Sequence, residues 1–281
     1  MSELRFNNDM HLHTFFSDGL YSPTDIVKRA KRQKLDTIAI TDHDGIDGVR
    51  EAQIAAEALG DIKVVTGIEF STLDSEGVEN KRTGNVFKDL EIHMLGYNFD
   101  MENTELCAEL TKMKKNRRDR NDRLLAALND MGYDITQEDL LAENGHDYIG
   151  KPVFARVLVK KGYAESFTEA IAGERFLGSP EAKAVRKEKI EVKKAIELIN
   201  GAGGMAVCAH PVKTKGLGVR GTDEFFENLE ALIAKLKAYG MKGLECFHTD
   251  HTDEEEMWLV SMAEKYKLHI TRGSDFHGDE K

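Results

Sequence analysis

The chain has 281 residues, of which 41% are hydrophobic and 32% charged, and only 4 are proline. This length suits one large domain with an insertion or two ordinary domains, and the composition is typical of a soluble globular protein. The formal net charge of −11 argues against broad, sequence-independent binding of nucleic acid, which depends on Lys and Arg, but it does not exclude a small anionic substrate.

No apolar run approaches the ~20 residues needed to span a bilayer, so no membrane partner is expected. The first ten residues, "MSELRFNNDM", have neither a basic start nor an apolar stretch, so secretion is not expected either. Cys107, Cys208 and Cys246 are an odd number without CxxC spacing. They indicate reduced thiols and a cytoplasmic location.

Strand and helix patterns alternate along the two ends of the chain. Seven short β-rich runs, most of them ending in polar residues, are predicted as strands at 8–14, 36–44, 62–72, 90–99, 203–211, 242–248 and 268–277. Helical periodicity is found between them, at 22–34, 46–60, 192–200, 223–239 and 253–266. This alternation predicts parallel βαβ units and an α/β fold, in which chemistry gathers at the carboxyl ends of the strands.

The strands fall into two blocks, which predict one barrel built from residues 1–101 and 187–281. Between them, residues 102–186 have long amphipathic and charged stretches and no convincing strand. We interpret this segment as a helical insertion that covers the barrel mouth as a substrate cap. Residues 73–89 are polar and contain glycine, which predicts a mobile loop or a hairpin.

Nine histidine and carboxylate residues at the predicted strand ends form a candidate metal site: His11, His13, Asp18, His43, Glu69, His93, His210, Asp275 and His277. Imidazole and carboxylate ligands without thiolates suit catalytic Zn, Mn or Fe. Residues i and i+2 of a strand face the same side, so both His-x-His and Asp-x-His can point inward. A single histidine in such a place is more often an ordinary core or surface residue, and His146 and His269 are interpreted so. The joint occurrence of nine favours metal binding.

The motifs "HLHTFFSDG", "ITDHD", "GIEFS", "IHMLGY", "AHP" and "GSDFHG" resemble, in order and spacing, those of the PHP (polymerase and histidinol phosphatase) domain family. The stretch "GKPVFARVLVKKGY" resembles its TrpH-like branch of metal-dependent phosphoesterases. This resemblance implies a distorted (β/α)7 barrel with the helical insertion. It also implies two or three divalent ions, with Mn expected first and Zn or Fe as alternatives.

The resemblance also implies how the ligands are shared. His11, His13, Glu69 and Asp275 would hold one ion, and Glu69 would bridge to a second ion held by His93 and His210. Asp18, His43 and His277 would hold a third. One motif departs from the branch, whose members commonly have Gly-Arg-Pro-His where this chain has Gly150-Lys151-Pro152-Val153. The substrates of those relatives therefore do not transfer directly.

Other residues are candidates for catalysis and substrate binding. No G-x-S-x-G elbow or comparable cysteine motif is present, so no protein nucleophile is expected. Asp42 is either a carboxylate behind the ligands or a cap at the strand end, and His248 is either a proton donor to the leaving group or a plain loop histidine. The candidate phosphate-binding cations are Arg117, Arg120, Lys151, Arg156, Lys213 and Arg272. For the run 114–123, a solvated helix face is the ordinary alternative.

The leading hypothesis is a phosphoesterase that acts on a small phosphorylated metabolite through a hydroxide made by the metal ions and releases phosphate. It leans to a cyclic ribose phosphate, opened as a diester and then hydrolysed as a monoester. Alternatives are a nucleoside 3′,5′-bisphosphate phosphatase, a 5′–3′ exoribonuclease on short RNA, and a non-catalytic phosphate- or metal-binding regulator. Carbon–nitrogen hydrolysis is disfavoured because no lysine ends a strand. No stable nucleic-acid partner is expected, and the oligomeric state is left open.

Overall fold

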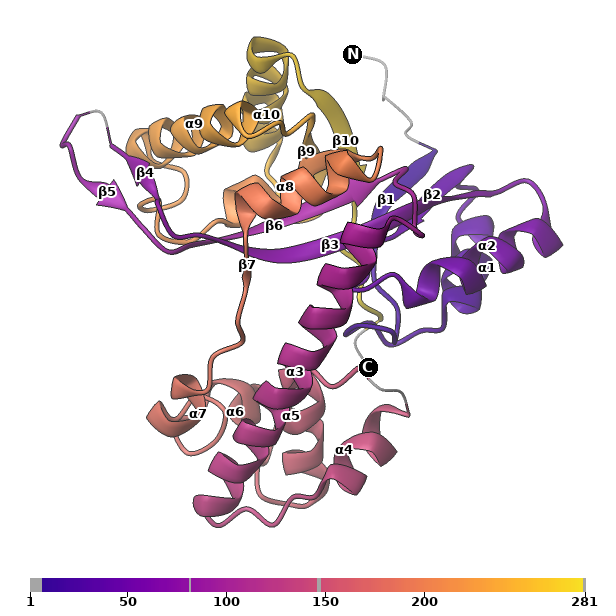
Figure 1. Cartoon of the computed structure of the whole chain (residues 1–281), viewed down its shortest axis with the longest axis vertical. Coiled ribbons are helices and arrows are strands. Elements are labelled where there is room, and N and C mark those ends of the chain that lie inside the picture. The colour runs from indigo at the N-terminus through magenta and orange to yellow at the C-terminus, as the bar shows by residue number, and fades with distance from the viewer. Residues whose placement is uncertain (1–6, 81, 146–147, 280–281) are drawn as a thin grey trace.

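The computed structural model describes residues 7–80, 82–145 and 148–279. Figure 1 shows a curved sheet with helices packed on its outer side and a long helix, α3 (Thr104–Asp130), that leads away from the sheet to a group of shorter helices. Within the described residues, every helix is too short or too polar to pass through a lipid bilayer.

Seven strands follow one another around the sheet in the order β1-β2-β3-β6-β8-β9-β10. Their bounds are Asn8–Leu12, Thr37–Ile40, Lys63–Asp74, Leu90–Tyr97, Met205–Cys208, Gly243–His248 and His269–Gly273. The first and last strands meet beside a parallel bridge between Leu12 and Phe276, where the His13 amide donates to the Phe276 carbonyl at 3.0 Å. The sheet is therefore a nearly closed barrel, and the predicted α/β barrel fold is confirmed.

One strand corrects the expectation of purely parallel pairing. β6 runs antiparallel to both β3 and β8, whereas the other neighbours in the order are parallel. The reason is the connection before it, because β3 and β6 are joined by a ribbon and a hairpin, β4 (Val78–Glu79) and β5 (Val86–Phe87), and not by a crossover helix. A hairpin was one of the two alternatives for residues 73–89. Glu69 and His93 consequently lie inside long strands and not at their ends.

The predicted helices of the barrel are present as α1 (Pro23–Arg32), α2 (Asp47–Leu59), α8 (Val192–Gly201), α9 (Asp223–Ala238) and α10 (Asp253–Tyr266). Their starts follow the expected signals: Ser22 caps α1 ahead of a proline, and Thr252 forms a capping box with Glu255. One apolar core joins α8, α9 and α10 to β3, β6, β8 and β9, and another joins α1 and α2 to β1 and β2.

The described residues between Thr104 and Ala184 form five helices and their connections, and they lie in the chain between β6 and the short strand β7 (Ile190–Glu191), which pairs with β3. After α3 come α4 (Gln137–Asn144), α5 (Lys151–Lys160), α6 (Phe167–Ala172) and α7 (Pro180–Ala184). These four helices and the second half of α3 have an apolar core of their own, whereas Leu106 and Leu110 in the first half of α3 belong to the barrel core. One helix thus links the two cores, and we call residues 104–184 the insertion (Figure 1).

Candidate metal centre

Glu69 lies at the centre of the predicted ligand cluster. It is fully buried in β3, and its two carboxylate oxygens lie within 3.4 Å of ring nitrogens from five histidines: His11, His13, His43, His93 and His210. The Oε1 atom faces His11, His93 and His210, and the Oε2 atom faces His13 and His43. A single carboxylate therefore stands between histidines that come from four segments of the barrel, because His11 and His13 share the first one.

The His-x-His and Asp-x-His pairs meet at the seam between β1 and β10. The Asp275 Oδ1 atom lies 3.3 Å from His11 Nε2 and 3.2 Å from His13 Nε2. His11, His13, Glu69 and Asp275 each offer one ligand atom within a single group whose atoms are at most 4.8 Å apart. This is the set that the resemblance implies for the first metal ion.

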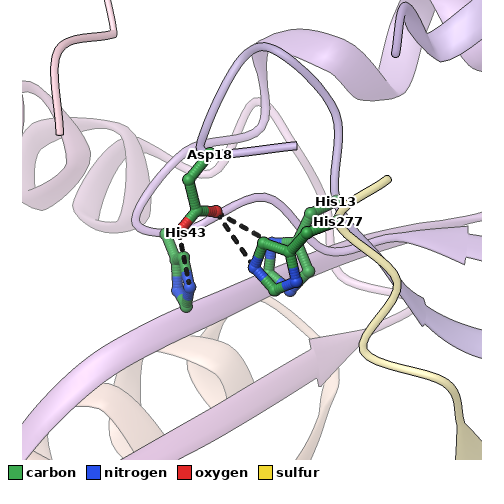
Figure 2. A group of neighbouring side chains, drawn as sticks. All are labelled: His13, Asp18, His43 and His277. Atoms are coloured by element: carbon green, nitrogen blue, oxygen red, sulfur yellow. Dashed lines mark ion pairs between the residues drawn. The ribbon is translucent and has the colours of Figure 1, made fainter. Parts of the chain in front are cut away.

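A second group surrounds Asp18 on the turn after β1 (Figure 2). Figure 2 shows the Asp18 carboxylate between His43 on one side and His13 and His277 on the other, and the latter two rings are stacked with centroids 4.0 Å apart. Asp18 lies 3.2 Å from His277 Nε2, 3.7 Å from His43 Nε2 and 3.8 Å from His13 Nδ1. The third expected set is brought together, with His13 added to it.

The backbone at the cluster is held in an unfavourable conformation. Asp275 and Asp44 have φ values of 55° and 53°, and His210 has 24°, although none of them is glycine. Each such residue costs on the order of 1–3 kcal/mol and persists only where its surroundings fix it. Because two of the three are expected ligands, the strain lies where side-chain direction matters most.

Opposite charges inside the cluster shift its ionisation equilibria. Burial opposes the charged form of His43, yet the Glu69 and Asp18 carboxylates outweigh it and raise the pKa of His43 to about 9. Burial likewise opposes ionisation of Glu69, but His43, His93 and His11 hold the pKa of its carboxyl well below the usual range. For His210, burial is the larger effect and lowers the pKa of the ring. Without a cation, protons on some of these rings balance the carboxylates.

The cluster fits divalent cations. Several converging atoms are buried and have no hydrogen-bond partner among the described residues: His11 Nε2, His13 Nε2, Asp18 Oδ1, His43 Nδ1 and Glu69 Oε2. Buried polar groups are rarely left in this state unless an ion or water completes them. Imidazole nitrogens and carboxylate oxygens within one such group are the donors that Mn, Fe and Zn accept.

Asp42 binds the turn that carries two of the expected ligands. Its carboxylate accepts hydrogen bonds from the Thr14 amide and hydroxyl, both at 2.7 Å, and from the Ser17 hydroxyl at 2.6 Å. Ser17 in turn lies 3.4 Å from His13 Nδ1. Asp42 thus fixes the turn that carries His13 and Asp18, which favours a positioning role over direct catalysis.

His248 ends β9 beside the cluster, with its side chain buried. The Asp250 amide donates to its Nδ1 atom at 3.0 Å, so in the neutral ring the proton resides on Nε2. The Nε2 atom lies 3.7 Å from Asp275 Oδ2, and it has no hydrogen-bond partner within the described ranges. This nitrogen is therefore a proton donor that faces the ligands.

Two cationic clefts flank the cluster and share Glu91, which precedes His93 by two residues. The first, of about 500 Å³, is lined by His93 and His210 and by Lys88, Lys213 and Lys215. The second, of about 810 Å³, lies between β3, β6 and the insertion, and its cations are Arg120, Lys151, Lys183, Arg186, Lys187 and Lys189. We call the second the cap cleft.

Arg120 of α3 is the most unusual residue of the cap cleft. Only 4% of it is exposed, and its Nε and Nη1 atoms have no hydrogen-bond partner in the parts of the chain that the structure describes. Burial lowers the pKa of its guanidinium, and no carboxylate is among the charges that act on it. A buried cation without an anion is costly, so the site suits an anionic ligand.

The other expected phosphate-binding residues have different surroundings. Arg117 reaches Asp44 at 3.3 Å and stacks over the Tyr148 ring, and Lys213 lies 3.0 Å from Asp275. Arg156 contacts Glu143 and Asn144 inside the insertion. Arg272 donates to the Asn8 carbonyl and lines a cleft together with Asp275 and His277. The contacts of Arg156 lie within the insertion, so they give no support to its expected role in substrate binding.

Sequence reasoning missed three residues at the site. Glu245 contacts His11, Lys187 pairs with Asp44, and Asp44 itself accepts from the Ser71 amide at 2.9 Å. A glutamate inside the apolar strand "GLECF" was the available signal for Glu245. His269 is exposed at the start of β10, in line with its ordinary assignment, and His146 lies outside the described residues.

Comparison with known proteins agrees with this geometry. The family model of the PHP domain matches residues 9–199. A 5′-3′ exoribonuclease from Haemophilus influenzae is 33% identical over 96% of this chain and 89% of its own. A 3′,5′-nucleoside bisphosphate phosphatase from Chromobacterium violaceum is 28% identical, over 96% and 87%. A phosphoribosyl 1,2-cyclic phosphate 1,2-diphosphodiesterase from Eggerthella lenta is 26% identical, over 96% and 94%.

The fold has solved counterparts as well. A structure named as that of a metal-dependent phosphoesterase from Bifidobacterium adolescentis superposes with a TM-score of 0.78, at 29% identity over 98% of this chain and 88% of that one. The similar enzymes share phosphate ester hydrolysis, and the cluster offers the donors that such chemistry needs. The chain belongs to the PHP domain family, and it is a metal-dependent phosphoester hydrolase.

Proposed function

We propose that the substrate carries two phosphates on one ribose and that short 5′-phosphorylated RNA, shortened from its 5′ end, is the preferred form. One phosphate lies at the ligand cluster and is hydrolysed, and the other occupies the cap cleft. The observation that carries this proposal is the buried Arg120 guanidinium, whose Nε and Nη1 atoms have no hydrogen-bond partner within the described residues and which lines the cap cleft together with Lys187.

The cap cleft adjoins the cluster through two residues. Lys187 lines the cleft and pairs with Asp44, which follows His43. Glu91 lines it from β6, two residues before His93. One substrate can therefore place one phosphate at Arg120, Lys151 and Lys183 and another at the cluster. Because the two sites adjoin, the group that joins the phosphates must be short, as a ribose is. The local cations also remove the objection that the net charge of −11 raises against RNA.

Bound divalent ions supply a hydroxide at neutral pH and hold the phosphoryl oxygens during an in-line displacement. The nine residues of the cluster hold these ions, which we propose to be two or three and to be Mn²⁺ first, with Fe or Zn as alternatives. Lys213 lies 3.0 Å from Asp275 and offers its ammonium to a phosphoryl oxygen. His248 Nε2 donates its proton to the leaving oxygen, which otherwise leaves as an alkoxide.

A nucleoside 3′,5′-bisphosphate has the same two phosphates and is the second candidate. A ribose 1,2-cyclic phosphate with a further phosphate, favoured by the sequence alone, also satisfies the cations. RNA is placed first because the chain is more similar to the named exoribonuclease, at 33% identity, than to the cyclic phosphodiesterase, at 26%. The cap cleft, with a volume of about 810 Å³ and six cationic side chains, is also large enough for more than one nucleotide unit.

The test is hydrolysis by the Mn²⁺-loaded protein of three substrates: a 5′-phosphorylated ribotrinucleotide, a nucleoside 3′,5′-bisphosphate and a phosphoribosyl cyclic phosphate. Products are identified by mass, and His13→Ala is the control because it removes a ligand shared by two groups. The expected result is mononucleotides from the trinucleotide at the highest kcat/KM, with none from the control. Turnover of a singly phosphorylated ribose at the same kcat/KM would contradict the two-phosphate proposal.

A further inference from the structure

Glu245 is a buried carboxylate whose two oxygens bind two different histidines. It lies in β9 between Leu244 and Cys246, and it is 0% exposed. Its Oε1 atom is 3.0 Å from His11 Nδ1, and its Oε2 atom accepts the His210 amide at 2.7 Å. Both oxygens of this buried carboxylate are therefore occupied by histidine N–H groups.

The contact with His11 determines which ring nitrogen faces the cluster. The other oxygen of Glu245 already accepts the His210 amide, and as an acceptor its Oε1 atom requires the proton on Nδ1 of His11, which donates it to Glu245. The lone pair is then on Nε2, which lies 3.4 Å from Glu69 and 3.3 Å from Asp275. Glu245 thus fixes both the tautomer and the direction of this ring.

The contact with His210 involves the backbone. His210 has a φ of 24°, in the region that non-glycine residues avoid, and it lies two residues after the end of β8. The charge-assisted hydrogen bond from its amide to Glu245 holds the peptide in this conformation. The side chain then places Nε2 3.2 Å from Glu69 Oε1. Glu245 thus secures one histidine through its ring and another through its backbone.

The neighbouring strand leaves room for this arrangement. A Cβ atom at Gly273, the last residue of β10, would lie 2.4 Å from Glu245 Oε1 and 2.2 Å from the His11 Cβ atom. Only glycine therefore allows β10 to approach both residues. Residues of three strands, β1, β9 and β10, therefore pack closely at the Glu245 carboxylate.

We propose that Glu245 is a positioning residue that couples the two metal positions sharing Glu69, one through His11 and the other through His210. This proposal rests on the metal-dependent activity proposed above. Glu245 could alternatively be a ligand itself, since it forms a group with His11 and His248. The positioning role is favoured because the Glu245 oxygens face N–H groups of His11 and His210, while the lone pair of His11 Nε2 faces Glu69 and Asp275.

The test compares the metal affinity of Glu245→Gln with that of a control, Asp74→Asn. Gln has the same shape, but its amide NH₂ faces one of the two N–H donors, so one hydrogen bond is lost. Asp74 is likewise a buried carboxylate in the barrel, but it pairs with Lys235, away from the cluster. Mn²⁺ dissociation constants are measured by competition with a chelator, bound metal by elemental analysis, and folding by unfolding of the metal-free proteins.

We expect roughly 10- to 100-fold weaker metal binding in Glu245→Gln, at both positions that share Glu69, and no change in Asp74→Asn. Wild-type affinity in a folded Glu245→Gln protein would contradict the positioning role. Where Gln prevents folding, Glu245→Asp, which is too short to reach both histidines, replaces it. Unfolding of both metal-free Glu245 variants would assign the residue to the core and also contradict the proposal. A wild-type protein that binds no divalent ion would instead overturn the proposed function.

Discussion

Lys187 forms an ion pair with Asp44, the buried residue directly after His43. Arg117 of α3 reaches the same carboxylate oxygen at 3.3 Å. Lys187 lies just beyond the end of the insertion and Arg117 in the middle of its first helix, so two segments meet the barrel at one carboxylate. These ion pairs anchor the insertion beside the cluster.

Replacing Asp44 with Asn is expected to destabilise the protein by about 3 kcal/mol, because the buried Arg117 and the half-buried Lys187 lose the carboxylate that balances their charges. The measurement is chemical unfolding of the metal-free protein. The matched control is Asp47→Asn, which removes an exposed ion pair with Lys114 and is expected to cost less than about 1 kcal/mol. Equal losses in the free energy of unfolding for the two substitutions would show that the Asp44 ion pairs stabilise the protein no more than an exposed ion pair does.

Arg120→Met is expected to raise KM roughly 10- to 100-fold for substrates with two phosphates, since a charge-assisted hydrogen bond contributes about 1.5–3 kcal/mol. Stability should be kept or improved, because a buried cation without a partner is removed. Arg123→Met on the exposed side of α3 serves as the control. A KM that rises equally for singly phosphorylated substrates would argue against a second phosphate in the cap cleft.

His248→Gln is expected to lower kcat about 100-fold or more on RNA with little change in KM or in bound metal, because a general acid contributes roughly 10²–10⁴. The comparison substrate is p-nitrophenyl phosphate, whose leaving group needs no proton. Its turnover should be nearly unaffected by the substitution. If both substrates slow down equally, His248 supports the site in another way.

The buried ring of His251 predicts a dependence of stability on pH. Burial lowers its pKa from 6.5 to about 4, which His248 reinforces and the Cys246 carbonyl, Glu245 and Glu255 oppose. Between these values the unfolded chain binds a proton that the folded chain does not, so stability is lost as pH falls from about 6.5 to about 4. His251→Gln should flatten this dependence in unfolding experiments on metal-free protein. An unchanged slope would show that the histidine is charged in the fold.

Features that depend on local periodicity could be predicted from the sequence. His11 and His13 point to one side because strand residues alternate, and the helices between the strands were visible from their apolar spacing and caps. The antiparallel direction of β6 was not predictable in this way. It depends on whether residues 73–89 form a crossover or a hairpin, and their polar composition is compatible with both.

Contacts between residues far apart in the chain could not be predicted from the sequence. Glu245 is 234 residues away from His11, and a single glutamate in an apolar strand does not reveal which ring it binds. Lys187 and Asp44 are likewise 143 residues apart, and Lys187 stands among several similar lysines. Arg120 was proposed together with Arg117, but only the structure shows that one has a carboxylate partner and the other has none among the described residues.

We propose that this cluster hydrolyses phosphate esters only when divalent metal ions are bound to it. The most direct measurement is mononucleotide release from a 5′-phosphorylated ribotrinucleotide by chelator-treated protein, before and after Mn²⁺ is added, for the wild type and Glu69→Gln. We predict no release before addition, recovery in the wild type, and no recovery in Glu69→Gln, because the carboxylate between five histidines is lost. Equal release from both proteins, with or without metal, would contradict the account.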